Sequence, residues 1–325
     1  MPYPIITPGY FAELTDPNIP ENESVTYNVL STPAAIEYIF PLNQERLIKK
    51  LMDTPDVLSY KMRNLKPDAE EELMQHSKDL IDQNPVLQHY WAIKTLTMNI
   101  LQNRNYIFEK RMLLLNYAYK TIQGMLDQMK EDLIPGFIAA FTKEPKHDEV
   151  MKYFSEIKPN FALSMCDALS LFRSMPKCEE WDKVCDDIFR ITNNKKDLAQ
   201  FNYVEADYLK MKKAYYEDFL KGKEHYIEQV MVNYVWTYCL PYADLQVTLW
   251  ENFIFFNIIF NAIKVMLTIY TYDKKDKDAA FIEAVKAFDT SMRLVNGGSV
   301  VKHIVDVNAQ EGLNNNGDMA IMSMS

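Results

Sequence analysis

The sequence predicts an all-α protein: a multi-helix bundle or array around a central buried helix, with an irregular N-terminal arm. Glycine is rare, with 8 residues in 325, where average usage of about 7% would give roughly 20. The glycine-rich turns of β-hairpins must therefore be few. Several long segments repeat apolar residues with the period of a helix. Hydrophobic residues make up 48% of the chain, which is enough for one large core or two packed helical parts.

The first 30 residues are predicted to form an irregular arm that lies on the body of the protein. Five prolines in this stretch repeatedly interrupt helix propagation. The first helix is expected to begin at Thr32 and Pro33, where a capping residue precedes a proline at the first helical position. Asn84 and Pro85 repeat this pattern and predict a second helix start of the same kind.

The clearest helical period covers residues 106–133. Apolar side chains recur there at spacings of four and three, as in a coiled-coil seam. They are Phe108, Met112, Leu115, Tyr119, Ile122, Leu126, Met129 and Leu133. A helix is therefore expected over the whole stretch. Pro135 then interrupts it, and residues 134–141 are expected to form a short continuation.

Two later segments, residues 226–239 and 281–295, show the same helical period. The first is expected to end before Pro241 and the second at the glycine pair 297–298. Between them, residues 244–270 predict a long helix whose most apolar part contains Glu251, Lys264 and three asparagines. Because each of these polar residues is costly in hydrocarbon, a buried central helix is favoured over a membrane span.

Pro145 and mixed charges interrupt the apolar pattern and suggest a division of the chain. An N-terminal helical part is expected at residues 31–142, with a C-terminal helical part at 143–311 packed on it. Residues 312–325 are rich in Asn, Gly, Met and Ser and have no apolar period. This tail is predicted to be disordered.

The charge and cysteine patterns narrow the classes of function. The net charge is −10, and the lysines between residues 210 and 223 alternate with acidic residues, so a solvated helix face is favoured over a nucleic-acid surface. Cys178 and Cys185 would lie about 10.5 Å apart on a helix, too far for a disulfide. Since no signal peptide is recognised, reduced thiols and a cytoplasmic location are expected.

No self-contained catalytic or metal-binding motif is found. A di-iron bundle needs two Glu-x-x-His pairs, and the one such spacing, Glu144 to His147, contains a proline. The five histidines are scattered, which disfavours zinc. Glycine-rich nucleotide loops and a G-x-S-x-G elbow are missing. We therefore expect no metal site in this chain.

Residues 101–115 read LQNRNYIFEKRMLLL, in which Gln102 and Arg104 are followed by Glu109 and Arg111. This arrangement resembles a segment of the flagellin lysine-N-methylase family, where an L-Q-x-R element precedes x-x-E-R-L-x-x-L. The match holds to within one residue of register. The residues concerned are helix-packing elements, so the resemblance concerns the helical body.

Two further segments are similar to the same family. Residues 226–236 read YIEQVMVNYVW and precede Pro241, which resembles the family's (F/Y)-E-N-Y-L-V-N-Y-x-F…P-F helix. Residues 30–35 read LSTPAA and resemble its L-S-C-P-E-A step, with Thr32 in place of the cysteine. The resemblance covers about residues 30–300 and implies a bacterial protein.

The sequence departs from the family in its cysteines. The family carries a cysteine-rich N-terminal region associated with an iron–sulfur cluster, whereas this chain has no cysteine before Cys166. Cluster ligation needs several converging thiolates. No cofactor is therefore expected within this chain alone. The resemblance implies the helical body of a methylase, inactive or incomplete without that region, and leaves open whether a separate chain supplies it.

The resemblance implies S-adenosylmethionine-dependent N-methylation of lysines in flagellin or another protein substrate. The lysine must reach the methyl donor as a neutral amine. This requires a partly desolvated pocket that lowers the pKa of the lysine. The expected polar groups of that pocket are Glu228, Asn233 and Tyr234, with Arg104 and Arg111 as orienting charges. Structural roles stay open for all five, because Tyr234 fits the apolar stripe of its helix and Arg111 can pair within the helical body. No catalytic residue is assigned.

Two other functions stay open on the sequence. The seam at residues 106–133, the methionine content and the N-terminal arm also fit a non-enzymatic helical module that binds a protein partner. A weaker hypothesis is an apolar ligand site lined by Phe253, Phe256, Phe260 and Met266, although burial in a core explains these residues equally well.

Overall fold

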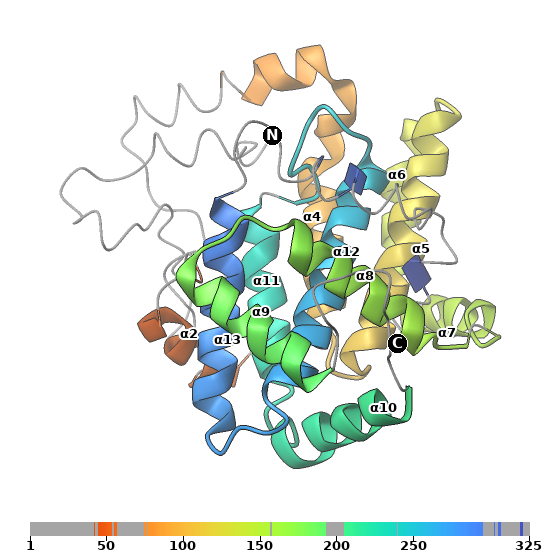
Figure 1. Cartoon of the computed structure of the whole chain (residues 1–325). Coiled ribbons are helices and arrows are strands. Elements are labelled where there is room, and N and C mark those ends of the chain that lie inside the picture. The colour runs from red at the N-terminus through yellow and green to blue at the C-terminus, as the bar shows by residue number, and fades with distance from the viewer. Residues whose placement is uncertain are drawn as a thin grey trace. The chain divides into compact units, whose positions relative to one another are not determined.

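The computed structural model shows an all-α protein (Figure 1). It describes residues 42, 45–53, 55–56, 75, 77–156, 158–192, 205–238, 240–294, 302, 305–306 and 319–320. Within these ranges there are helices and no strand, which confirms the predicted fold class. The N-terminal arm, the helix start at Thr32 and the glycine stop at 297–298 lie outside the described residues.

The chain forms two compact units, and each unit collects segments that are far apart in the sequence. Among the described residues, unit 1 contains Asp56–Phe154 and Glu228–Phe253. Unit 2 contains Pro41–Pro55, Ser155–Ile227 and Ile254–Ser325. Helices α11 (His225–Thr237) and α12 (Leu249–Tyr270) contribute residues to both units.

The division of the chain into helical parts at 31–142 and 143–311 stays a prediction. The tail at 312–325 lies almost wholly outside the described residues. Its described residues, Met319 and Ala320, are both buried, and the backbone oxygen of Met319 accepts a 3.0 Å hydrogen bond from Asn257.

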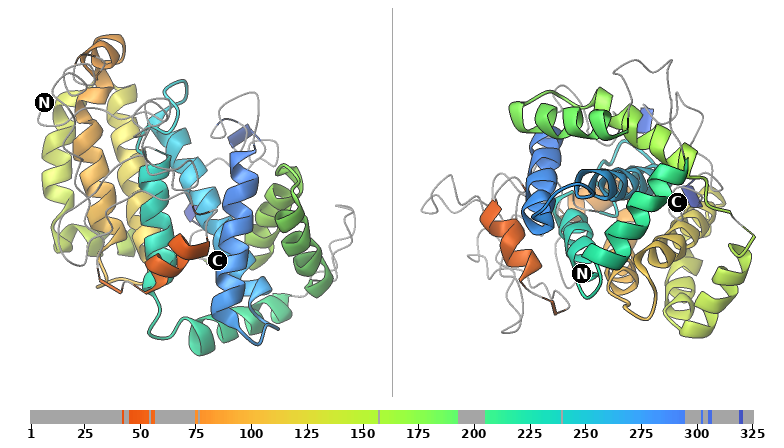
Figure 2. Two further views of the ribbon diagram at one scale, coloured as in Figure 1. Left: turned by 90° about the vertical axis from the view of Figure 1, so that its left-hand side faces the viewer. Right: turned by 60° about the horizontal axis from the view of Figure 1, so that its bottom comes forward.

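Unit 1 is a group of helices around α4 and α5, which lie side by side (Figure 2). Besides parts of α11 and α12, its elements are η2 (Pro85–His89), α4 (Tyr90–Leu101), α5 (Phe108–Asp127), η3 (Glu131–Leu133), α6 (Ile134–Phe141) and α7 (Glu144–Tyr153). The short helix predicted at 134–141 is confirmed as α6, with Pro135 in its first turn. Pro is compatible with that position because the first turn needs no intrahelical N–H bond.

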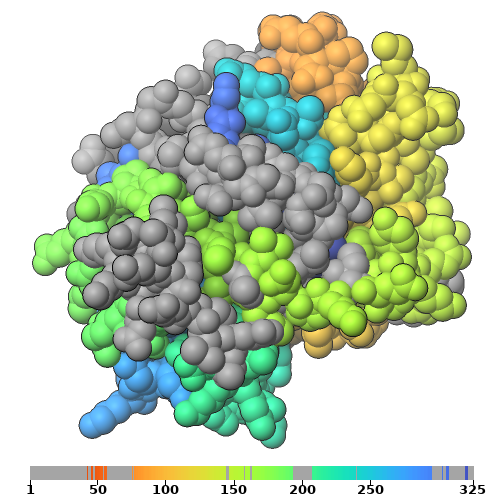
Figure 3. Space-filling view, turned by 45° about the vertical axis from the view of Figure 1, so that its right-hand side comes forward, coloured from red at the N-terminus to blue at the C-terminus, as the bar shows by residue number. Residues whose placement is uncertain are grey.

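Helix α5 ends at Asp127, so the prediction of one helix through residue 133 is wrong. Met129 adopts a left-handed conformation with φ of 55°. Its N–H donates to Leu126 O at 3.0 Å, and the next N–H donates to Met125 O at 2.9 Å. This is a Schellman closure with methionine where glycine is usual. Met129 is 86% exposed, and the α5–α6 segment, in yellow, lies at the surface in the space-filling view (Figure 3).

Replacing Met129 with glycine is expected to stabilise the protein by about 0.5–1 kcal/mol. Glycine adopts φ of +55° without the steric cost of about 1–2 kcal/mol that an L side chain incurs, and the exposed methionine loses little burial. Urea unfolding of M129G and of M129A measures the difference. A glycine variant no more stable than the alanine variant would contradict this account.

Unit 2 is centred on α12, whose residues in this unit are all buried. Its other elements are α2 (Glu45–Met52), α8 (Phe161–Ser174), α9 (Glu179–Ile191), α10 (Glu205–Ala214), the π-helical turn η4 (Tyr215–Phe219) and α13 (Lys277–Arg293). Trp181 of α9 is 1% exposed. Its ring meets Phe172 of α8 and Phe288 of α13 edge-on, at centroid distances of 5.3 and 5.7 Å. One indole therefore joins three helices.

Helix α12 is the buried central helix that the sequence predicts. By length and composition it could cross a membrane, but its apolar window is 100% buried in this structure, as expected for a core helix. Asn261 donates to Ser164 O at 3.0 Å and to Asp167 Oδ2 at 2.9 Å. Asn261, one of the polar residues that argued against a membrane span, is therefore hydrogen-bonded within unit 2. The aromatic residues considered for an apolar ligand, Phe253, Phe256 and Phe260, are core residues at most 2% exposed.

Candidate functional site

Glu228 of α11 brings together two of the arginines that the sequence singled out. Its carboxylate accepts bonds from Arg104 Nε (3.1 Å to each oxygen) and Nη2 (2.8 Å to Oε1). Arg111 Nη1 donates to Oε2 at 2.6 Å. Arg111 also donates to Tyr106 O and Leu101 O, both at 2.7 Å. The two segments that carry the family resemblance, residues 101–115 and 226–236, therefore meet at this one carboxylate.

The three charges differ in their exposure. The side chains of Glu228 and Arg111 are 2% and 6% exposed, whereas that of Arg104 is 40% exposed. Burial lowers the pKa of the Arg111 guanidinium, and the hydrogen bond to Glu228 raises the pKa of Arg104. Both guanidinium groups stay charged at neutral pH, so the cluster carries a net charge of +1. Four bonds occupy the roughly four acceptor positions of the carboxylate, and this cluster therefore clamps α11 to the α4–α5 connection.

The other two predicted site residues, Asn233 and Tyr234, lie on the same helix but not at this cluster. They follow Glu228 by five and six residues, which is about 7.5–9 Å along the axis and on other faces of the helix. Asn233 Nδ2 donates to Thr237 Oγ1 at 3.3 Å. Tyr234 is fully buried and stacks on Tyr238 at a centroid distance of 5.4 Å. Their role in a substrate pocket stays a prediction.

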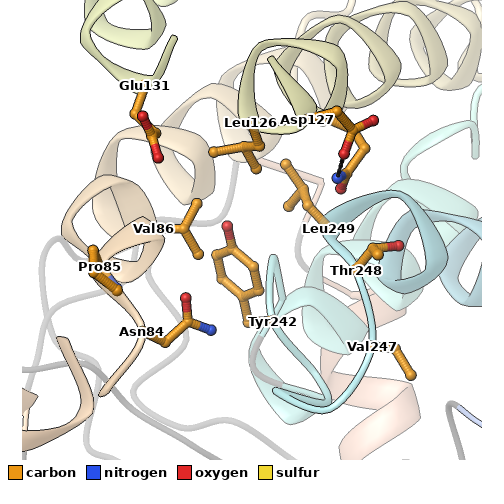
Figure 4. A pocket seen from close by; sticks show the side chains of 11 residues that line it. Asn84, Pro85, Val86, Leu126, Asp127, Glu131, Tyr242, Val247, Thr248 and Leu249 are labelled. Carbon is orange, nitrogen blue, oxygen red and sulfur yellow. Dashed lines mark hydrogen bonds between the residues drawn. The ribbon is translucent and has the colours of Figure 1, made fainter. Parts of the chain in front are cut away.

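Unit 1 also contains a pocket of about 360 Å³ that the sequence did not predict. It is formed where several elements of the unit end or begin, and Figure 4 shows Tyr242 among the lining side chains. The lining residues are Asn84, Pro85, Val86, Gln123, Leu126, Asp127, Glu131, Tyr242, Val247, Thr248 and Leu249. Asp127 and Glu131 are the charged members of this lining, and both are acidic.

One wall of the pocket is fixed by the start of α12. Thr248 and Glu251 form a capping box, in which Glu251 Oε2 accepts from Thr248 N at 2.7 Å and Glu251 N donates to Thr248 Oγ1 at 3.1 Å. The helix therefore begins at Leu249, and the predicted start near residue 244 is wrong. Gln123 of α5 accepts from Trp250 N at 3.1 Å and donates to Asp127 Oδ1 at 2.7 Å. This side chain joins the acidic end of α5 to the start of α12.

The backbone just before Tyr242 is held by a buried lysine. Lys94 of α4 is 2% exposed and donates through Nζ to Leu240 O at 2.9 Å and to Val235 O at 3.3 Å. The ammonium also lies 4.2 Å from the ring centroid of Trp236, within the range of a cation–π interaction. Lys94 thus fixes the backbone two residues before Tyr242 and positions that residue in the pocket.

Replacing Lys94 with methionine is expected to lower the free energy of unfolding by about 1–2 kcal/mol. Two buried carbonyl oxygens lose a donor, which costs about 1–3 kcal/mol, and the removal of a buried charge offsets part of this cost. Urea unfolding measures the change. The matched control is Lys120→Met, because the exposed Lys120 also lies over an indole, that of Trp250, at 4.7 Å. Equal effects of the two substitutions would contradict the anchoring role.

Among the described residues, no group of three or more His, Cys, Asp or Glu side chains is arranged to hold a metal ion. The lining of the pocket contains no lysine or arginine that could pair with the carboxylate of S-adenosylmethionine, and its side-chain N–H donors are the amides of Asn84 and Gln123.

Comparison with known proteins supports the relationship that the sequence suggested. The family model for the FliB lysine N-methylase C-terminal domain matches residues 94–322, which include Arg104, Arg111, Glu228 and Tyr242. Comparison with curated proteins gave no match, and comparison with solved structures gave none. The family match covers well over half of the 325 residues. The chain belongs to the FliB lysine N-methylase C-terminal domain family.

Proposed function

We propose that this protein takes part in the N-methylation of lysine side chains on flagellin or another protein, with S-adenosylmethionine as the methyl donor. The observation that carries the proposal is the family match over residues 94–322. The donor, when bound, supplies the methyl group. The part assigned to this chain is to hold the protein substrate, and the acidic pocket of unit 1 is consistent with that part because a lysine side chain is cationic.

The test is methyl transfer from labelled S-adenosylmethionine to purified flagellin, read by mass spectrometry of the lysine-containing peptides. The full chain is assayed alone and after anaerobic iron–sulfur reconstitution, and flagellin with acetylated lysines is the control substrate. Transfer in either arm that disappears on acetylation supports the proposal. No transfer in either arm, together with no calorimetric binding of S-adenosylmethionine, would overturn it. Stable association with flagellin under those conditions would instead support the non-enzymatic interaction module.

A further inference from the structure

Tyr242 places a polar group in the pocket that the fold itself does not use. The residue is 4% exposed, and its hydroxyl has no hydrogen-bond partner among the described residues. Burial raises the pKa of this phenol, so it stays neutral and can both donate and accept a hydrogen bond. Buried hydroxyls are normally paired. In Figure 4 the Tyr242 hydroxyl lies between Val86, Leu126 and Leu249, on the side of the pocket where Glu131 lies.

The charge of the pocket indicates which kind of group would satisfy that hydroxyl. Asp127 and Glu131 contribute two negative charges, and no cationic side chain lines the pocket. The bond from Gln123 Nε2 is made to Oδ1 of Asp127, and an ionised carboxylate has about four acceptor positions. A cation with several N–H donors therefore matches the lining, whereas an anion would meet repulsion.

The backbone places the two carboxylates on either side of the turn at Met129. Asp127 is the last residue of α5 and Glu131 is the first residue of η3. The left-handed conformation of Met129 reverses the chain between them. Both residues line the same pocket.

The size and apolar lining of the pocket suit a side chain. Its volume of about 360 Å³ lies near the lower end of the range of about 300–1,000 Å³ for small-molecule sites. Val86, Leu126 and Leu249 supply aliphatic surface beside the polar groups. A flexible aliphatic stem with a cationic tip can place methylenes on such surface and its charge among acceptors. A lysine side chain has this form.

We propose that this pocket binds the primary ammonium group of a lysine side chain presented by another protein. Asp127 and Glu131 provide the counter-charge, the Tyr242 hydroxyl oxygen accepts one N–H bond, and the aliphatic residues receive the methylene stem. The identification of that lysine as the one to be methylated rests on the proposed function above. The binding of an alkylammonium group does not.

Ligand-observed NMR titration of the full chain tests the proposal, with Nα-acetyl-lysine amide as the probe and no methyl donor present. The uncharged control ligand is Nα-acetyl-norleucine amide, which keeps the aliphatic stem and lacks the ammonium. We expect saturable binding of the lysine amide, at least about tenfold weaker binding of the norleucine amide, and competition by n-butylammonium chloride. Equal binding of the two amides would overturn the proposal.

Three variants test whether the lysine amide binds in this pocket. The double variant Asp127→Asn, Glu131→Gln is expected to weaken binding of the lysine amide at least about tenfold. Tyr242→Phe keeps the ring and is expected to weaken it about tenfold or more, as for the loss of one hydrogen bond to a charged group. Glu149→Gln removes an exposed carboxylate outside the lining and is expected to bind as the wild type does. Thermal unfolding verifies that each variant is folded, and unchanged affinity in the folded double variant would overturn the site.

A final arm separates this site from a cofactor site and from the proposed function. If S-adenosylmethionine displaces the lysine amide, and its own binding is lost in the double variant, the pocket is a cofactor site and the proposal is wrong. Methyl transfer without binding of the lysine amide would overturn this site and leave the proposed function standing. Binding without methyl transfer would support the ammonium site and remove its assignment to a methylation substrate.

Discussion

Replacing Glu228 with glutamine is expected to lower the free energy of unfolding by about 3 kcal/mol. Removing one partner of a buried ion pair costs about 3–5 kcal/mol, because the remaining charge stays buried without compensation. Here Arg111, with a side chain 6% exposed, keeps its two carbonyl partners and loses the carboxylate of Glu228. The glutamine keeps the shape and one acceptor oxygen, which places the effect at the lower end of that range.

The matched control for this prediction is Arg104→Gln. Arg104 binds the same carboxylate but its side chain is 40% exposed, so its charge is solvated and its loss is expected to cost about 1 kcal/mol or less. Urea unfolding at neutral pH of both variants and the double variant gives the coupling between the two positions. A Glu228→Gln variant as stable as Arg104→Gln would show that the carboxylate is not a buried clamp.

Replacing Trp181 with alanine is expected to cost about 3–5 kcal/mol, the range for removal of a large aromatic side chain from a core. The indole is 1% exposed and contacts Phe172 and Phe288 edge-on. Its Nε1 donates to Phe172 O at 3.4 Å. The substitution removes contacts with two neighbouring helices at once and leaves a cavity between α8, α9 and α13.

Trp181→Phe is the graded control, since it retains a ring and loses the N–H and part of the volume. We expect it to cost less than half as much as the alanine variant. Thermal unfolding and urea unfolding of the three proteins measure this order. An alanine variant within about 1 kcal/mol of the wild type would mean that the three helices close on the cavity, because the penalty falls when a site can collapse.

The parts of the fold that could be predicted are those fixed by a local apolar period. Residues 134–141 form α6 as expected, and the periods at 226–239 and 281–295 correspond to α11 and α13 within a few residues. The ends of helices were harder to predict where the signal is backbone geometry. A methionine at position 129 does not predict a left-handed backbone conformation, because the usual residue at this position of a Schellman motif is glycine. The capping box of Thr248 and Glu251 can be recognised in the sequence, and it marks the start of α12.

The candidate sites could be predicted only in part, because they depend on contacts between residues far apart in the sequence. Arg104, Arg111 and Glu228 could be selected from the sequence because they belong to short family-like segments. Their pairing could not be predicted, since it joins positions more than a hundred residues apart. The pocket around Tyr242 has no local pattern at all. Its lining comes from segments near residues 84–86, 123–131 and 242–249, and only the folded backbone brings them together.

The position of Lys94 determines where the chain can be truncated without loss of the pocket. The region shared with the family begins at this residue, in the middle of α4. Excision at that point would leave the ammonium at a frayed chain end, without Tyr90, whose hydroxyl lies 3.3 Å from Nζ. It would also remove Asn84, Pro85 and Val86 from the pocket lining. The shortest fragment that retains the pocket described here therefore starts upstream of η2, and the boundary of shared ancestry is not a boundary of the folded unit.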